Sequence, residues 1–182
     1  MKKIFLTLAI GSAFVLGLSS CQKGDSEVKN SQLTGQYIKA TIDTSATASG
    51  MNYLFTNSLP TGKFQTVGNN KVIVITTPST SFPYLSLTID VTGVNDLASF
   101  SLSAPKICPL MGTNANAVTY SRSASSSWSS VGSSTVLDNI TLTKIEPQTG
   151  TNNKYLEGIF SGKIGSPARA VTNGVFRALI VP

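Results

Sequence analysis

The chain has 182 residues with 14 basic and 8 acidic side chains, a formal net charge of +6, and no histidine. Without histidine, Ser-His-Asp and Cys-His catalysis, a histidine general base and the usual histidine-containing zinc sites are all excluded. The basic residues form no run of three, which argues against the clustered surface that binds nucleic acid.

The first 20 residues have the pattern of a secretory signal peptide. Lys2 and Lys3 precede an apolar stretch over 4–18, shorter than the about 20 residues that a membrane-spanning helix needs. It ends in Leu18-Ser19-Ser20-Cys21, which resembles the lipobox of bacterial lipoproteins. The resemblance implies cleavage before Cys21, a diacylglyceryl thioether on its sulfur and a fatty acid on the new amino group. An ordinary signal peptide followed by a chance cysteine is the alternative.

Residues 21–32 form the expected lipidated cysteine and a polar, flexible tether, ahead of one domain over 33–182. Three acyl chains exceed the two signals that stable anchoring needs, so we expect the protein to stay on a membrane. Gln22 stands where an aspartate favours inner-membrane retention in well-studied lipoproteins, which favours the outer membrane. The stretch 22–27 also resembles short Lys/acid signals that carry Bacteroidota lipoproteins to the cell surface. A generic tether explains it equally well, so the side that the domain faces stays open.

From Leu33 onward the pattern is that of β-strands. The stretch 84–92 alternates between apolar and polar residues, which predicts one buried and one open face. The stretch 38–42 alternates in the same way, and the β-branched run over 71–76 is typical of a central strand. Gly68, Asn69 and Asn70 predict a turn joining that run to a strand over 62–67.

The C-terminal part predicts a hairpin and one further strand. Strands over 139–145 and 155–164 are separated by a loop rich in Gly, Asn and Thr. Asn173-Gly174 then predicts a turn that introduces a last strand over 175–181, apolar on both faces and therefore expected inside a sheet. Together the patterns predict an all-β domain, an antiparallel β-sandwich or a related barrel, with about eight or nine strands.

Residues 103–135 interrupt this rhythm with a Ser-rich irregular segment, expected to hold one short strand over 117–121. Long irregular segments often carry function, and this one holds Tyr120, Arg122 and the only tryptophan, Trp128. An exposed Trp/Tyr pair could stack on a sugar or anchor a protein, so these three are the candidate ligand-binding residues. The alternative, which we favour, places Trp128 in the core among solvent-facing serines.

Other chemistry has weaker support. Asp90, Asn95 and Asp96 around a glycine turn are a weak candidate for Ca²⁺, although such residues are more often ordinary turn formers. Asp90 and Asp138 could in principle serve a hydrolase, but no pattern points to one. Cys108 stands in an apolar setting and is expected to be a small buried hydrophobe. We therefore predict no catalytic residue and no cofactor.

The last third of the chain resembles small uncharacterised Bacteroidota lipoproteins with a β-sandwich fold. The resemblance rests on the Gly-x-Phe-Ser-Gly stretch 158–162 and the Thr-Asn-Gly-x-Phe stretch 172–176. It implies a β-sandwich lipoprotein and supplies no catalytic residues. The residues also have a structural explanation, because Gly158 and Gly162 flank Phe160 on one strand face and allow close backbone approach around a buried ring.

These patterns lead us to expect a non-enzymatic outer-membrane lipoprotein that binds an envelope protein or a glycan, with residues 103–135 as the binding edge. A structural or assembly subunit held through sheet edges is the alternative, and a hydrolase is the third possibility.

Overall fold

The computed structural model describes residues 35–43, 51–54, 59–77, 82–110, 116–130 and 138–182, which all belong to one unit, Leu33–Pro182. The expected signal peptide, Cys21 and the tether lie outside the described residues. Among the described residues there is no helix long and apolar enough to cross a membrane. They form eleven strands: β1 Tyr37–Ile42, β2 Met51–Leu54, β3 Thr61–Val67, β4 Asn70–Thr76, β5 Tyr84–Asp90, β6 Lys106–Pro109, β7 Ala117–Ser123, β8 Ser126–Ser129, β9 Asn139–Pro147, β10 Lys154–Ile164 and β11 Arg169–Val181.

All eleven strands join in one sheet, in the order β6-β9-β10-β11-β3-β4-β5-β7-β8, with β1 beside β11 and β2 beside β1. The sheet forks at β11, because β1 pairs with its residues 171–177 and β3 pairs with its last residues, 179–181. The β3–β11 pair is parallel and the other strand pairs are antiparallel. The predicted all-β fold is confirmed, and its mostly antiparallel sheet is mixed through this one parallel contact.

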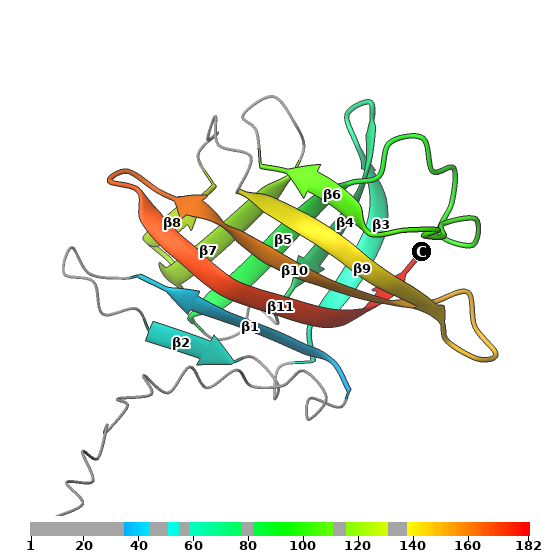
Figure 1. The fold of residues 1–182 in the computed structure, drawn as a ribbon, viewed down its shortest axis with the longest axis horizontal. Helices are drawn as coiled ribbons and strands as arrows, with labels where there is room; N and C mark the ends of the chain where they lie inside the picture. The colour runs from blue at the N-terminus through cyan, green and yellow to red at the C-terminus, as the bar shows by residue number, and fades with distance from the viewer. Residues whose placement is uncertain (1–34, 44–50, 55–58, 78–81, 111–115, 131–137) are drawn as a thin grey trace, which may run out of the picture. The chain divides into compact units, whose positions relative to one another are not determined.

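The sheet folds back on itself, so that two groups of strands face each other across a shared core (Figure 1). We call the group β6, β9, β10, β11, β1 and β2 the front half and the group β3, β4, β5, β7 and β8 the back half. On the side away from β3, an isolated bridge between Ser130 and Ile164 connects the halves again.

The alternating strands supply this core as their sequences predict. Leu85, Leu87 and Ile89 of β5 are fully buried, and so are the apolar residues 38, 40 and 42 of β1. The predicted β3–β4 hairpin is confirmed, with a turn at Gly68 (φ +60°) and Asn69. The strand over 70–76 lies between β3 and β5, in agreement with its β-branched composition.

Asn173 and Gly174 form a bulge inside β11 and not the predicted turn. Strand β11 already begins at Arg169, and its register shifts at this point against both β1 and β10. Asn173 has φ +53°, the left-handed conformation that both turns and bulges use. The Asn-Gly preference for this conformation therefore produces a bulge, and β11 continues through it.

Two glycine–phenylalanine pairs face each other across β10 and β11. Gly158 pairs with Phe176, and Phe160 pairs with Gly174. A Cβ atom on Gly158 would stand 2.6 Å from the Phe176 ring, and one on Gly174 would stand 2.6 Å from the Phe160 ring. Each ring therefore covers the glycine of the opposite strand, and the expected role of Phe160 as a buried ring beside close backbone is confirmed.

The segment 103–135 is more regular than its composition suggested. It contributes three strands, β6, β7 and β8, where the sequence predicted one. Residues 111–115 and 131–137 of this segment lie outside the described residues. The additional short strands bring the described total above the expected eight or nine.

Strand β6 pairs with β9 and is an edge of the sheet. The Leu110 amide donates to the Asp138 carbonyl at 2.9 Å. Since hydrogen-bonded positions alternate along an antiparallel strand, the backbone of Cys108 also faces β9, and that of Ile107 and Pro109 faces outward. Pro109 has no amide hydrogen, so the free edge of β6 lacks a hydrogen-bond donor that an added strand would need.

Candidate functional site

An aromatic pair is exposed at the start of β5. The rings of Phe82 and Tyr84 lie 5.4 Å apart between centroids and are tilted by 34°. Phe82 is 43% exposed, and Tyr84 is half-buried. Because Leu85 points into the core, strand alternation directs Tyr84 to the outer face of the back half. An apolar ring with accessible surface beside a phenol is suited to stacking on a ligand.

A line of hydroxyl groups crosses the same face. Five side chains, one from each strand of the back half, stand directly opposite one another in successive strand pairs. They are Thr61, Thr76, Ser86, Thr119 and Ser129, which we call the hydroxyl row. The row points outward, because the neighbouring residues Ile75, Leu85 and Val118 are buried in the core. Thr61 and Ser129 at its ends are exposed, and the three middle residues are half-buried.

The aromatic pair and the hydroxyl row adjoin each other on β5. Tyr84 and Ser86 are two residues apart, so their side chains share one face. Beyond Tyr84, the Ser121 hydroxyl donates to Ser127 at 2.8 Å, and within the row the hydroxyls of Thr119 and Ser129 lie 2.8 Å apart. A hydroxyl group both donates and accepts, so the accessible hydroxyls of Thr119 and Ser129 retain capacity for a ligand, whereas Ser121 is buried at 1% exposed.

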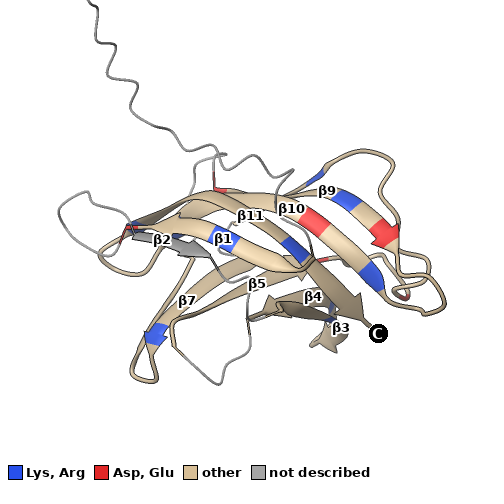
Figure 2. Ribbon diagram, turned by 90° about the horizontal axis from the view of Figure 1, so that it is seen from below, with Lys and Arg blue, Asp and Glu red and all other residues tan. Residues whose placement is uncertain are grey.

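Charge is sparse on this face. Its described strands carry Lys63 of β3, Asp90 of β5 and the exposed Arg122 of β7, and Figure 2 shows a blue segment at one end of β7. Hydrogen bonds from Thr92, chiefly from its side chain, and the nearby Lys106 lower the pKa of Asp90 from its ordinary value. The site therefore offers apolar rings and neutral hydroxyls.

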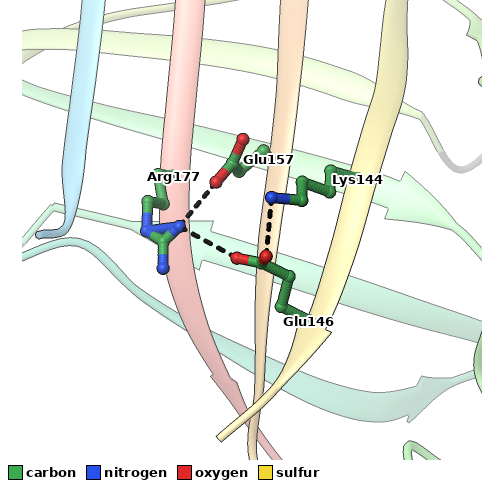
Figure 3. A network of polar contacts seen from close by, with 4 residues as sticks. All are labelled: Lys144, Glu146, Glu157 and Arg177. Carbon is green, nitrogen blue, oxygen red and sulfur yellow. Dashed lines mark hydrogen bonds and ion pairs between the residues drawn. The ribbon is translucent and has the colours of Figure 1, made fainter. Parts of the chain in front are cut away.

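The front half carries a charged cluster on its outer face instead (Figure 3). The Arg177 guanidinium contacts the carboxylates of Glu157 (2.5 Å) and Glu146 (3.4 Å), and Lys144 contacts Glu146 at 2.6 Å. Arg177 also lies 4.4 Å over the Tyr155 ring. Two cations meet two anions, so this cluster is internally neutral and has the form of a structural network across β9, β10 and β11.

The predicted Tyr120/Trp128 platform does not form an open surface. Tyr120 is fully buried, so it has no face to offer a ligand. Trp128 is half-buried against the core, stacks on Tyr120 (centroids 5.7 Å apart) and lies under the Arg169 guanidinium at 4.9 Å. This agrees with the favoured interpretation of Trp128 as a core residue. Arg122 is exposed at a bulge in β7 and is separate from the Tyr120–Trp128 stack.

The two acidic candidates for Ca²⁺ binding, Asp90 and Asp96, are hydrogen-bonded within turns. Asp90 accepts from the Thr92 amide at 2.8 Å, and Asp96 accepts from the Ser99 amide at 2.7 Å. Asn95 is exposed beside Asp96. Within the described ranges, no group of three or more Cys, Asp or Glu side chains gathers as a metal ion would require. These contacts are those of ordinary turn formers, the interpretation that the sequence favoured.

Asp138 and Cys108 are both buried in the front half. Asp138 is 8% exposed and directly precedes β9, where its carbonyl holds Leu110. Cys108 is 2% exposed, and burial raises the pKa of its thiol. A buried thiol with a raised pKa is a poor nucleophile, so the predicted packing role of Cys108 is confirmed.

Sequence reasoning missed Phe82 and Tyr84 as a site. A signal was present, because the alternation that buries Leu85 also places Tyr84 on the polar face with Ser86. The hydroxyl row gave no such signal, since it exists only through the pairing of five strands.

The chain matches no protein-family model, and neither a curated protein nor a solved structure matches it significantly. Fold and site together define an all-β protein with an aromatic and hydroxyl-lined outer face.

Proposed function

We propose that this chain is a lipid-anchored outer-membrane protein whose back half binds a glycan without catalysing a reaction. The exposed Phe82–Tyr84 pair beside the hydroxyl row is the observation that carries the proposal. Sugar rings present apolar C–H faces that stack on aromatic rings, and their hydroxyls bond to Ser and Thr hydroxyls. Anchoring through Cys21 is supported by the lipobox-like sequence.

The non-enzymatic part rests on the titratable groups of this face. Glycoside hydrolysis ordinarily needs two carboxylates on either side of the scissile bond. On the described strands of the back half, Asp90 is the one outward carboxylate, and it is engaged with Thr92. In the part of the chain that the structure describes, this face therefore has the groups to hold a sugar and presents no carboxylate pair that would cleave it.

Affinity electrophoresis of the purified full chain in mild detergent tests the binding. Gels would contain dextran, laminarin or mannan, three neutral polysaccharides. We expect at least one to retard the protein, and Tyr84→Ala or Phe82→Ala to weaken binding about five- to tenfold, the value of one aromatic contact. Tyr155→Ala, an aromatic truncation on the front half, is the matched control. Unchanged retardation of Tyr84→Ala would overturn the proposal.

Detergent partitioning tests the anchor. The wild-type chain produced in bacteria should enter the detergent-rich phase of a phase-separating non-ionic detergent, and Cys21→Ser should not. Recovery of both in the aqueous phase would refute lipidation. A non-permeant protease added to intact cells, with a periplasmic protein as control, then distinguishes a surface position from a periplasmic one.

A protein partner is the second candidate function, because the front half exposes Ile107 (63%) and Ile159 (47%), which both stand opposite Thr141. Such a surface would bind a partner by its face, since Pro109 obstructs strand addition at the β6 edge. Ile107→Lys with Ile159→Lys should then abolish crosslinking to the partner and leave polysaccharide retardation unchanged. Assembly through sheet edges has less support.

A further inference from the structure

The hydroxyl row runs across the strands and not along one of them. Neighbouring strands lie about 4.8 Å apart, so the row places a hydroxyl at regular steps and spans about 19 Å from Thr61 to Ser129. That span exceeds a single sugar ring several times. A monosaccharide or a chain terminus on Tyr84 would leave most of the row without a ligand.

The row is also twisted. Adjacent strands rotate by about 20–25° relative to each other, so Thr61 and Ser129 point in clearly different directions. A rigid flat lattice would touch only part of such a line. A chain with rotatable glycosidic bonds can follow it and bond to successive hydroxyls.

The row itself favours a neutral ligand. Flanking outward positions include Val74 and Ala117. Of the charged residues described on these strands, Lys63, Asp90 and Arg122 lie beside the row and Lys71 lies over the Phe64 ring, so none stands within it. An acidic polysaccharide would call for several cations along its path, and the five positions of the row carry none.

From these three features we infer that the site takes an internal segment of a linear neutral polysaccharide, laid across β3, β4, β5, β7 and β8 with one ring on Tyr84. This rests on the proposed glycan binding and specifies its ligand. Affinity then depends on chain length, because each further sugar reaches a further strand.

Calorimetry with a disaccharide, a tetrasaccharide and a hexasaccharide from each of dextran, laminarin and mannan tests this on the full chain in detergent. For the polymer that binds, affinity should rise at least about tenfold from disaccharide to hexasaccharide, as several hydrogen bonds are added. Thr61→Val and Ser129→Ala, at the two ends of the row, should each weaken hexasaccharide binding about threefold to tenfold and leave the shortest sugar that binds unaffected. Thr172→Val, an exposed threonine of the front half, is the control.

The outcomes separate the two proposals. Equal affinity for short and long sugars, lost in Tyr84→Ala and retained in both row variants, would overturn the linear-chain inference and keep glycan binding. Absence of binding to every length and every polymer would overturn both. Thermal unfolding of each variant confirms that a loss of affinity is not a loss of fold.

Discussion

The ring of Phe176 lies over Gly158 on the neighbouring strand, and this contact is repeated by Phe160 over Gly174. The glycines leave room where a Cβ would stand, and the rings exclude water from the backbone they cover. The two rings also contact each other, with centroids 6.3 Å apart. The Gly-x-Phe and Gly-x-Phe stretches of β10 and β11 are thus two halves of one packing unit.

Gly174→Ala should destabilise the domain by about 1 to 3 kcal/mol, the usual cost of overpacking a core. The added methyl would meet both the ring and the backbone carbonyl of Phe160. Urea unfolding measures the loss. Thr172→Ala, at an exposed position of the same strand, should stay within about 0.5 kcal/mol. Equal midpoints for wild type and Gly174→Ala would contradict the packing unit.

Trp128→Ala should lower the free energy of unfolding by about 2 to 4 kcal/mol. The loss is somewhat smaller than for a fully buried ring, because Trp128 is half-buried. The indole fills the space between Tyr120, Gly165 and the Arg169 guanidinium, so its removal leaves a cavity at the seam between the halves. Denaturant unfolding followed by circular dichroism measures the effect, with Ser125→Ala, at an exposed position nearby, as the control. A fully stable variant that loses polysaccharide binding would instead assign Trp128 to a binding surface.

Arg177 and Glu157 should be coupled by about 1 kcal/mol in a double-mutant cycle of Arg177→Met and Glu157→Gln. Their side chains are only 22% and 28% exposed, so solvent screens the pair less than a surface pair. Lys144 and Glu146, 54% and 39% exposed, provide the control cycle and should show almost no coupling. Equal coupling energies in both cycles would show that burial does not make the Arg177–Glu157 pair stronger than the Lys144–Glu146 pair.

Asp96 should stabilise the fold only while it is ionised. The amide and the hydroxyl of Ser99 lower its pKa in the folded state below the ordinary value of 3.8. Because the folded pKa is the lower one, the stabilisation is present above 3.8 and is lost as the pH falls through the folded pKa. Asp96→Asn should therefore have a lower free energy of unfolding than wild type at about pH 7, and the difference should disappear in acid. Urea unfolding of both proteins across this pH range measures it. A difference that does not change with pH would show that the charge of Asp96 contributes nothing to stability.

Local periodicity predicted most of the fold. Strands such as β5 are recognisable because burial of one face imposes alternation on the sequence itself. The short strands β6 and β8 were missed, since four residues hold too little pattern and their pairing with β9 and β7 decides their conformation. The Asn173-Gly174 bulge was read as a turn because both need the left-handed backbone that Asn and Gly adopt.

The candidate site was predictable only in part. Tyr84 belongs to a visible polar face. The Ser-rich neighbours of Trp128 favour a core position, whereas its being the only tryptophan indicates neither exposure nor burial. The hydroxyl row depends on the register of β3, β4, β5, β7 and β8. Register is set by the packing of the complete sheet, which no local window contains.

Strand β11 is the shared partner of β1, β10 and β3, and it is the last of the eleven to be synthesised. A growing polypeptide that lacks residues 169–181 has three strands without their common neighbour, and its two groups of strands lack the parallel contact through which they meet. The nascent chain therefore cannot close its core ahead of time. If the chain is exported as we propose, this order of synthesis keeps its core open until β11 has followed the other ten strands.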